Sequence, residues 1–113
     1  MDKVKINIKP ISVNDCWQGK RYKTSAYTNF ERYVLLSLPS IELPEPPYKI
    51  NFEFGFSSIK SDWDNPVKPI QDILSKKYGF NDNQIYEATV KKVLVKKGFE
   101  YFSYSIESIQ KAP

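Results

Sequence analysis

The chain has 113 residues and a mass of 13.2 kDa, which is the size of one domain. It has no histidine and one cysteine, Cys16, so histidine-dependent triads, histidine metal sites, internal disulfides and thiolate zinc clusters are excluded. Seventeen Lys and Arg residues against thirteen Asp and Glu residues give a net charge of +4, which favours a polyanionic partner.

Nothing in the sequence predicts a membrane or secretory segment. No apolar run reaches the roughly eighteen residues that a membrane span requires. The first five residues alternate in charge and lack the apolar region of a signal peptide. We therefore expect a single domain over residues 1–113 that resides in the cytoplasm.

The N-terminal quarter combines a strand with a long polar segment. Val4, Ile6 and Ile8 alternate with polar residues, which predicts a half-buried strand ended by Pro10. Residues 11–24 are polar and predict an irregular loop. Because that loop is long for a connection in a small domain, we expect it to be functional.

A first helix is predicted over residues 26–37. One apolar stripe runs along it, formed by Tyr27, Phe30, Val34 and Leu38. Thr28 and Glu31 fit a capping box, with Ser25 as the alternative N-cap. Pro39 ends the helix, and the proline-rich residues 39–47 predict a stiff surface connection.

The middle of the chain predicts a strand and a second helix. Residues 48–56 alternate strictly, with Ile50, Phe52, Phe54 and Phe56 on one face. A loop follows. The second helix covers residues 66–78, and its buried stripe is formed by Val67, Ile70, Leu74 and Tyr78.

Particular residues also predict where the second helix begins and ends. Asp64 or Asn65 is the expected N-cap. Pro69 is tolerated if it lies in the first turn, where backbone N–H groups lack helical partners. Gly79 stands where a left-handed C-terminal glycine belongs.

Two strands over residues 84–95 and 99–109 complete the chain. The connecting Lys96-Lys97-Gly98 predicts a hairpin with glycine in the turn. The element order is therefore β-α-β-α-β-β. It predicts an α+β fold in which two helices pack on one face of a mixed sheet.

The densest chemistry lies between residues 60 and 68. Asp62 and Asp64 follow a strand and precede a helix, and in extended backbone residues two apart point the same way. Two converging carboxylates favour a bound cation, and without histidine that cation is Mg²⁺ or Mn²⁺. Lys68 and Asp72 follow at helical spacing. The turn before Asp82 is short enough to bring this acid to the same end of the sheet.

The same residues also have a purely structural interpretation. An aspartate before a helix is usually a cap, and an Asp-Lys-Asp ladder is usually a solvated helix face.

The order Asp62-x-Asp64-Asn65-x-x-Lys68, Asp72, Gly79-Phe80 and Asp82-x-Gln84-Ile85 resembles the signature of the RusA family. Members of this family are Holliday junction resolvases found largely in phages and prophages. The opening Pro10-x-Ser12-x-Asn14, followed by Arg21, Thr24 and Tyr27, is similar to the family's first loop. The likeness spans about residues 10–108.

The resemblance implies a homodimeric endonuclease that depends on Mg²⁺ or Mn²⁺ and nicks two opposed strands of a four-way DNA junction. By position it implies that Asp62, Asp64 and Asp82 bind the metal and that Lys68 is the catalytic lysine. Asp72 corresponds to a further helix acid. A phage-encoded enzyme of this kind would act in the cytoplasm of a bacterial host.

The basic residues expected to contact DNA are Arg21, Lys60, Lys68 and Lys92. Edge-strand lysines also serve to prevent aggregation, which is the alternative for several other lysines of this chain. Two departures from the family pattern stand out. Asn81 occupies a position that is often acidic, and the arginine-rich approach to the first acid is reduced to Lys60.

Two other functions remain open at the level of sequence. The chain can be a non-catalytic nucleic-acid-binding module whose acids are caps and solvated charges. It can also be a metal-dependent nuclease that acts on other branched DNA or on RNA. Both nuclease hypotheses predict metal-dependent strand scission, and the binding module predicts none.

Overall fold

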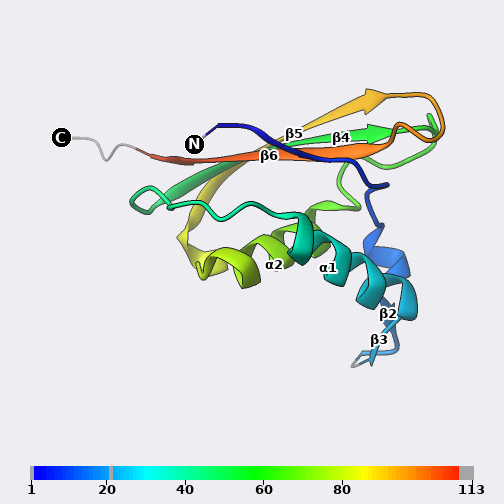
Figure 1. Ribbon diagram of the computed structural model, residues 1–113, viewed down its shortest axis with the longest axis horizontal. Helices are drawn as coiled ribbons and strands as arrows, with labels where there is room; N and C mark the ends of the chain where they lie inside the picture. The colour runs from blue at the N-terminus through cyan, green and yellow to red at the C-terminus, as the bar shows by residue number, and fades with distance from the viewer. Residues whose placement is uncertain (1, 21, 110–113) are drawn as a thin grey trace.

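A computed structural model describes residues 2–20 and 22–109 and has the α+β architecture that the element order predicts (Figure 1). Four strands form one mixed sheet in the order β1-β6-β4-β5. The strands are β1 (Val4–Ile6), β4 (Tyr48–Phe56), β5 (Ile85–Leu94) and β6 (Tyr101–Ser108). Helices α1 (Ser25–Ser37) and α2 (Val67–Tyr78) lie together on one face of this sheet (Figure 1).

Strand β4 has the bounds that its alternation predicts, and it organises the core. Ile50, Phe52 and Phe54 are buried and belong to one cluster with the apolar stripes of both helices. Lys49 and Glu53 alternate with them and are only partly buried. The strict period of two therefore decides which face of the sheet the helices cover.

Helix α1 buries the predicted stripe but begins at a different cap. The cap is Thr24, whose side chain accepts a hydrogen bond from the backbone N–H of Tyr27 at 3.1 Å. The expected caps Thr28 and Ser25 are wrong, because the extended backbone continues through Thr24 and the helix already starts at Ser25.

Helix α2 also agrees with the sequence at its C-terminus and differs at its N-terminus. Gly79 is left-handed, with φ at 76°, and donates its backbone N–H to Ser75. Neither Asp64 nor Asn65 occupies the N-cap position. Pro66 stands there without a side-chain cap bond. Pro69 lies buried in the first turn, where its missing N–H removes no helical bond.

The predicted hairpin between the last two strands is wrong. Strand β5 pairs in parallel with β4, and β6 pairs antiparallel with the other edge of β4, so β4 separates them. The crossover through α2 delivers β5 parallel to β4, and residues 95–100 then pass over the end of β4. Alternation within a strand defines its two faces but does not identify its neighbour.

The polar segment 11–24 is more ordered than an irregular loop. It contains a 3-10 turn, η1 (Val13–Asp15), and a small two-stranded ribbon, β2 (Trp17–Gln18) with β3 (Tyr22–Lys23). The ribbon projects from the body beside the start of α1 (Figure 1). Within the described part of the chain, neither helix is long and apolar enough to cross a membrane.

Candidate functional site

Asp62 and Asp64 lie on the loop of residues 57–66, which joins β4 to α2 and is called the acidic loop below. Both carboxylates are exposed. The loop turns at this point. The backbone N–H of Asn65 donates to the Asp62 carbonyl at 3.4 Å, and the side chain of Asn65 donates to the Asp62 carboxylate at 3.4 Å. The extended backbone assumed from the sequence is therefore wrong for this segment.

Two contacts tie the acidic loop to the rest of the molecule. The ammonium of Lys92, near the end of β5, donates to the carbonyls of Ile59 and Ser61 at 2.9 and 2.5 Å. On the other side, the backbone N–H of Val13 donates to the carbonyl of Asn65 at 2.9 Å. The loop therefore sits between the end of β5 and the N-terminal segment.

Lys68, in the first turn of α2, contacts two acids that follow it in the sequence, Asp72 and Asp82. Its Nζ lies 2.9 Å from a carboxylate oxygen of Asp72 and 3.0 Å from one of Asp82. Hydrogen bonds to Asp72 and then to Asp82 raise the pKa of Lys68. The lysine is therefore protonated at neutral pH and carries a fixed positive charge between two acids.

Asp82 begins a 3-10 turn, η2 (Asp82–Gln84), just before β5. Because Ile85 pairs with Tyr48, this turn lies at the end of the sheet where β4 begins. The acidic loop leaves β4 at its other end. The expected return of Asp82 to the same sheet end is therefore wrong, and Lys68 is what connects Asp82 to the first turn of α2.

Asn81, the departure from the family pattern, has a structural role. Its side-chain oxygen accepts a hydrogen bond from the backbone N–H of Asn83 at 3.3 Å. In return, the side chain of Gln84 accepts one from the backbone N–H of Asn81 at 2.9 Å. This reciprocal capping box fixes the turn that carries Asp82.

A cavity of about 690 Å³ opens between the acidic loop and the N-terminal segment. Apolar side chains, including Phe30 and Phe56, contribute to its lining. Its polar lining comes from Lys9, Ser12, Asn14, Asp15, Thr24, Ser61, Asp62 and Asn65. The opening-loop residues Ser12 and Asn14 therefore line the same cavity as Asp62. Asp15, which also lines the cavity, was not predicted as a site residue, because its distance in the sequence from Asp62 and Asp64 forms no recognisable pattern.

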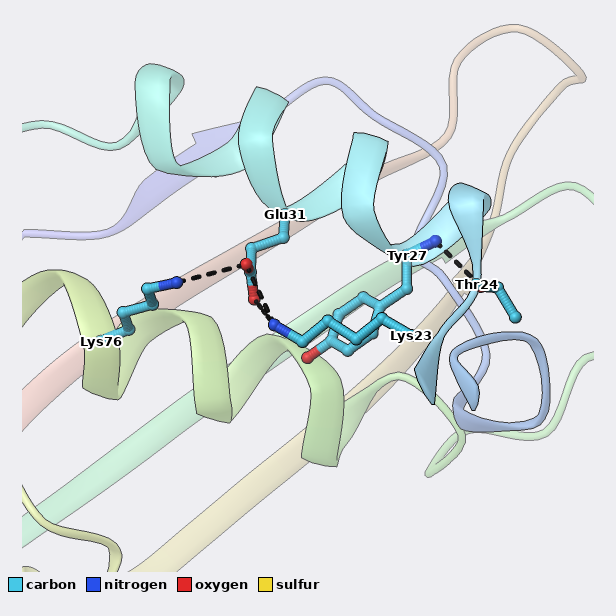
Figure 2. A network of polar contacts seen from close by, with 5 residues as sticks. All are labelled: Lys23, Thr24, Tyr27, Glu31 and Lys76. Atoms are coloured by element: carbon cyan, nitrogen blue, oxygen red, sulfur yellow. Dashed lines mark hydrogen bonds and ion pairs between the residues drawn. The ribbon is translucent and has the colours of Figure 1, made fainter. Parts of the chain in front are cut away.

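A polar network fixes the N-terminal segment against both helices (Figure 2). The Glu31 carboxylate on α1 accepts hydrogen bonds from Lys23 at 2.9 Å and from Lys76 on α2 at 3.3 Å. Lys23 also lies 5.3 Å from the centre of the Tyr27 ring. Burial raises the pKa of Glu31, but hydrogen bonds from Lys23 and Lys76 outweigh it and leave this pKa below its usual value.

The residues expected to contact DNA lie in different settings. Lys60 is exposed on the acidic loop, and Lys68 is exposed on α2. Lys92 is half-buried, and its ammonium is engaged by the loop carbonyls. Arg21 lies outside the described residues.

The donors of this region suit magnesium chemically. Among residues 2–20 and 22–109, no three acidic or cysteine side chains gather in a metal-holding group. Mg²⁺, however, usually takes only one or two carboxylates and completes its shell with water and substrate phosphates. The carboxylates of Asp62 and Asp64 are exposed to solvent, and that of Asp62 accepts only the 3.4 Å hydrogen bond from Asn65, so either fits that requirement as a single ligand. Asp82 is instead engaged by Lys68.

Comparisons of the chain with family models and with curated proteins find no match. The likeness to the RusA family therefore rests on the motif residues quoted from the sequence.

Proposed function

We propose that this chain is a divalent-cation-dependent endonuclease that acts as a homodimer and cuts four-way DNA junctions with paired nicks. The observation that carries the proposal is the contact of Lys68 with Asp82, 14 residues away in the sequence, at 3.0 Å. It joins the first turn of α2, which directly follows the loop of Asp62 and Asp64, to the turn that contains Asp82. These are the parts that the resemblance to the RusA family assigns to catalysis.

The chemistry of phosphodiester hydrolysis suits these residues. Asp62 and Asp64 would hold Mg²⁺ or Mn²⁺. Asp82, the further ligand that the resemblance implies, is paired with Lys68 and lies toward the other end of the sheet, so its part in this proposal is to hold that lysine. The bound ion supplies a more acidic water and neutralises charge on the phosphate oxygens. Lys68 carries a positive charge for the phosphate or a proton for the leaving oxygen. Asp72 and Asp82 keep the Lys68 ammonium in place before DNA binds.

The homodimer follows from the symmetry of the substrate. A four-way junction presents two equivalent strands to be cut, and one chain contributes one acidic motif. Two copies about a two-fold axis cut both strands in equivalent positions. The excess of positive charge over the whole chain favours binding to the DNA backbone.

The test uses a labelled synthetic four-way junction and a linear duplex of matched sequence. Each is incubated with the protein in Mg²⁺, Mn²⁺ or EDTA. Asp64→Asn runs beside the unaltered protein, and Asp2→Asn serves as a control because Asp2 is an exposed carboxylate outside the motif. We expect symmetric, metal-dependent nicks in the junction only, which disappear in Asp64→Asn and remain in Asp2→Asn.

Other outcomes select the alternatives. Junction binding without scission in either metal ion would reject the nuclease and favour a non-catalytic nucleic-acid-binding module. Metal-dependent scission of flaps or RNA in preference to the junction would keep the chemistry and reject the substrate. Scission that survives Asp64→Asn would reject the proposed site.

A further inference from the structure

The ammonium group of Lys92 is already hydrogen-bonded within the protein, unlike that of a lysine that is free to contact DNA. This ammonium donates to two backbone carbonyls of the acidic loop, those of Ile59 and Ser61, at 2.9 and 2.5 Å. The same nitrogen lies 5.9 Å from the centre of the Phe56 ring. Two of its three N–H donors are thus committed to the segment that immediately precedes Asp62.

Apolar packing anchors the acidic loop only at its C-terminal end, where Pro66 is buried. The side chains of Ile59 and Trp63 are 77% and 56% exposed, so the large apolar groups in the middle of the loop are not anchored in the core. That part of the loop is instead ordered by polar contacts. Inside the loop, Ser61 and Lys60 donate their backbone N–H groups to Ser58.

The contacts with Lys92 join this locally ordered loop to the sheet. Hydrogen bonds from a charged donor are the stronger class, and here one ammonium makes two of them to a short stretch of backbone. Strand β5 is paired along its whole length with β4, so the lysine stem starts from a rigid support. Loss of the ammonium would release the loop on the side of the sheet.

We infer that Lys92 is a positioning residue, which holds the acidic loop in place and with it the exposed carboxylates of Asp62 and Asp64, the groups proposed to bind the divalent cation. This inference assigns it a role other than the DNA contact expected from its charge. It deepens the proposed function and rests on it for the identity of the reaction. The control of the loop by Lys92 is measurable whether or not the protein cuts DNA.

Lys91 offers a matched control. It is the neighbouring residue of β5 and carries the same charge, but alternation turns it to the opposite face, where it lines a separate cavity with Glu53. Lys92→Met and Lys91→Met therefore remove the same charge from the same strand. Only the first removes the hydrogen bonds to the acidic loop, and methionine keeps much of the apolar stem.

The first measurement is amide hydrogen exchange of Lys60, Ser61 and Asn65, whose N–H groups are bonded within the loop. We expect exchange to become about tenfold faster in Lys92→Met, as loss of charged hydrogen bonds implies, and to stay within about twofold in Lys91→Met. In the unaltered protein, the Lys92 ammonium protons should exchange with water more slowly than those of Lys91. Unchanged loop exchange in Lys92→Met would overturn the inference.

The second measurement separates positioning from DNA contact. We expect Lys92→Met to weaken Mn²⁺-induced broadening of the Asp62 and Asp64 signals and to lower the single-turnover cleavage rate at saturating protein. Junction affinity and its salt dependence should change no more than in Lys91→Met. A loss of affinity with a smaller salt slope, and an unchanged cleavage rate at saturation, would mean that Lys92 contacts phosphate.

The two proposals fail differently. If the unaltered protein cuts no nucleic acid, the proposed nuclease fails, while loop exchange and Mn²⁺ broadening still decide the role of Lys92. If the unaltered protein cuts DNA and neither loop exchange nor Mn²⁺ broadening changes in Lys92→Met, the positioning role is refuted and the proposed nuclease is retained.

Discussion

Replacement of Lys68 by methionine should slow cleavage strongly with little loss of stability. The Lys68 side chain is 59% exposed, and those of its partners Asp72 and Asp82 are 39% and 44% exposed. Ion pairs this exposed contribute about 0.2–1 kcal/mol each, because water and salt screen them. Two such pairs limit the destabilisation of Lys68→Met to about 0.4–2 kcal/mol, which for a domain of this size lowers Tm by roughly 2–8 °C.

The expected effect on cleavage is much larger. A positive charge that stabilises a transition-state oxyanion is worth about 10²–10³-fold in rate. We therefore expect the single-turnover cleavage rate of the junction to fall by at least about 100-fold at a temperature where the variant is fully folded. Calorimetry gives Tm, and a gel assay with labelled junction gives the rate.

Lys76→Met is the matched control for this experiment. Lys76 lies on the same helix, is also 59% exposed and also forms an ion pair, with Glu31 at 3.3 Å. Its loss should cost a similar amount of stability and leave the cleavage rate within about threefold, because Glu31 is not one of the groups proposed for catalysis. Equal losses of cleavage in the two variants, or full activity in Lys68→Met, would refute the catalytic assignment of Lys68.

Three further predictions concern stability and reactivity. Hydrogen bonds from Lys23 and Lys76 leave the pKa of Glu31 below 4.5, so the stability this carboxylate contributes is present above pH 4.5 and is lost as the pH falls through its folded-state pKa. Urea unfolding of Glu31→Gln should show lower stability than the unaltered protein at pH 7 and a difference that shrinks below pH 4.5; a constant difference would contradict the network of Figure 2. A Cβ at Gly55 would overlap the Tyr101 ring, so Gly55→Ala should destabilise the fold by about 1–3 kcal/mol in urea titrations, and less when Tyr101 is first replaced by leucine. Burial, followed by the charge of Asp15, raises the pKa of Cys16 to about 11, so its thiol should react with alkylating reagents at pH 8 no faster than the protein opens, and rapid labelling of the folded chain would contradict this burial.

The sequence alone determined the elements that local periodicity specifies. The bounds of β4, the apolar stripe of α1 and the left-handed Gly79 follow from interactions between residues a few positions apart. In α2, Ile70 and Leu74 are buried as predicted, whereas Val67 and Tyr78 are only partly buried and Ile73, which was not predicted, is fully buried. The α+β class follows from the order of those elements, because two amphipathic helices and an alternating sheet have few ways to bury their apolar faces.

Tertiary structure alone decided which elements are neighbours and what the polar side chains contact. The last two strands read as a hairpin, yet both pair with β4, because pairing depends on the crossover through α2 rather than on alternation. The charge of Lys92 predicts a contact with phosphate, but its ammonium donates hydrogen bonds to backbone carbonyls 31 and 33 residues away in the sequence. Asp82 likewise meets Lys68 across a turn that Asn81 caps. Such contacts join parts of the chain that only the packing of the whole sheet brings together, so no local pattern encodes them.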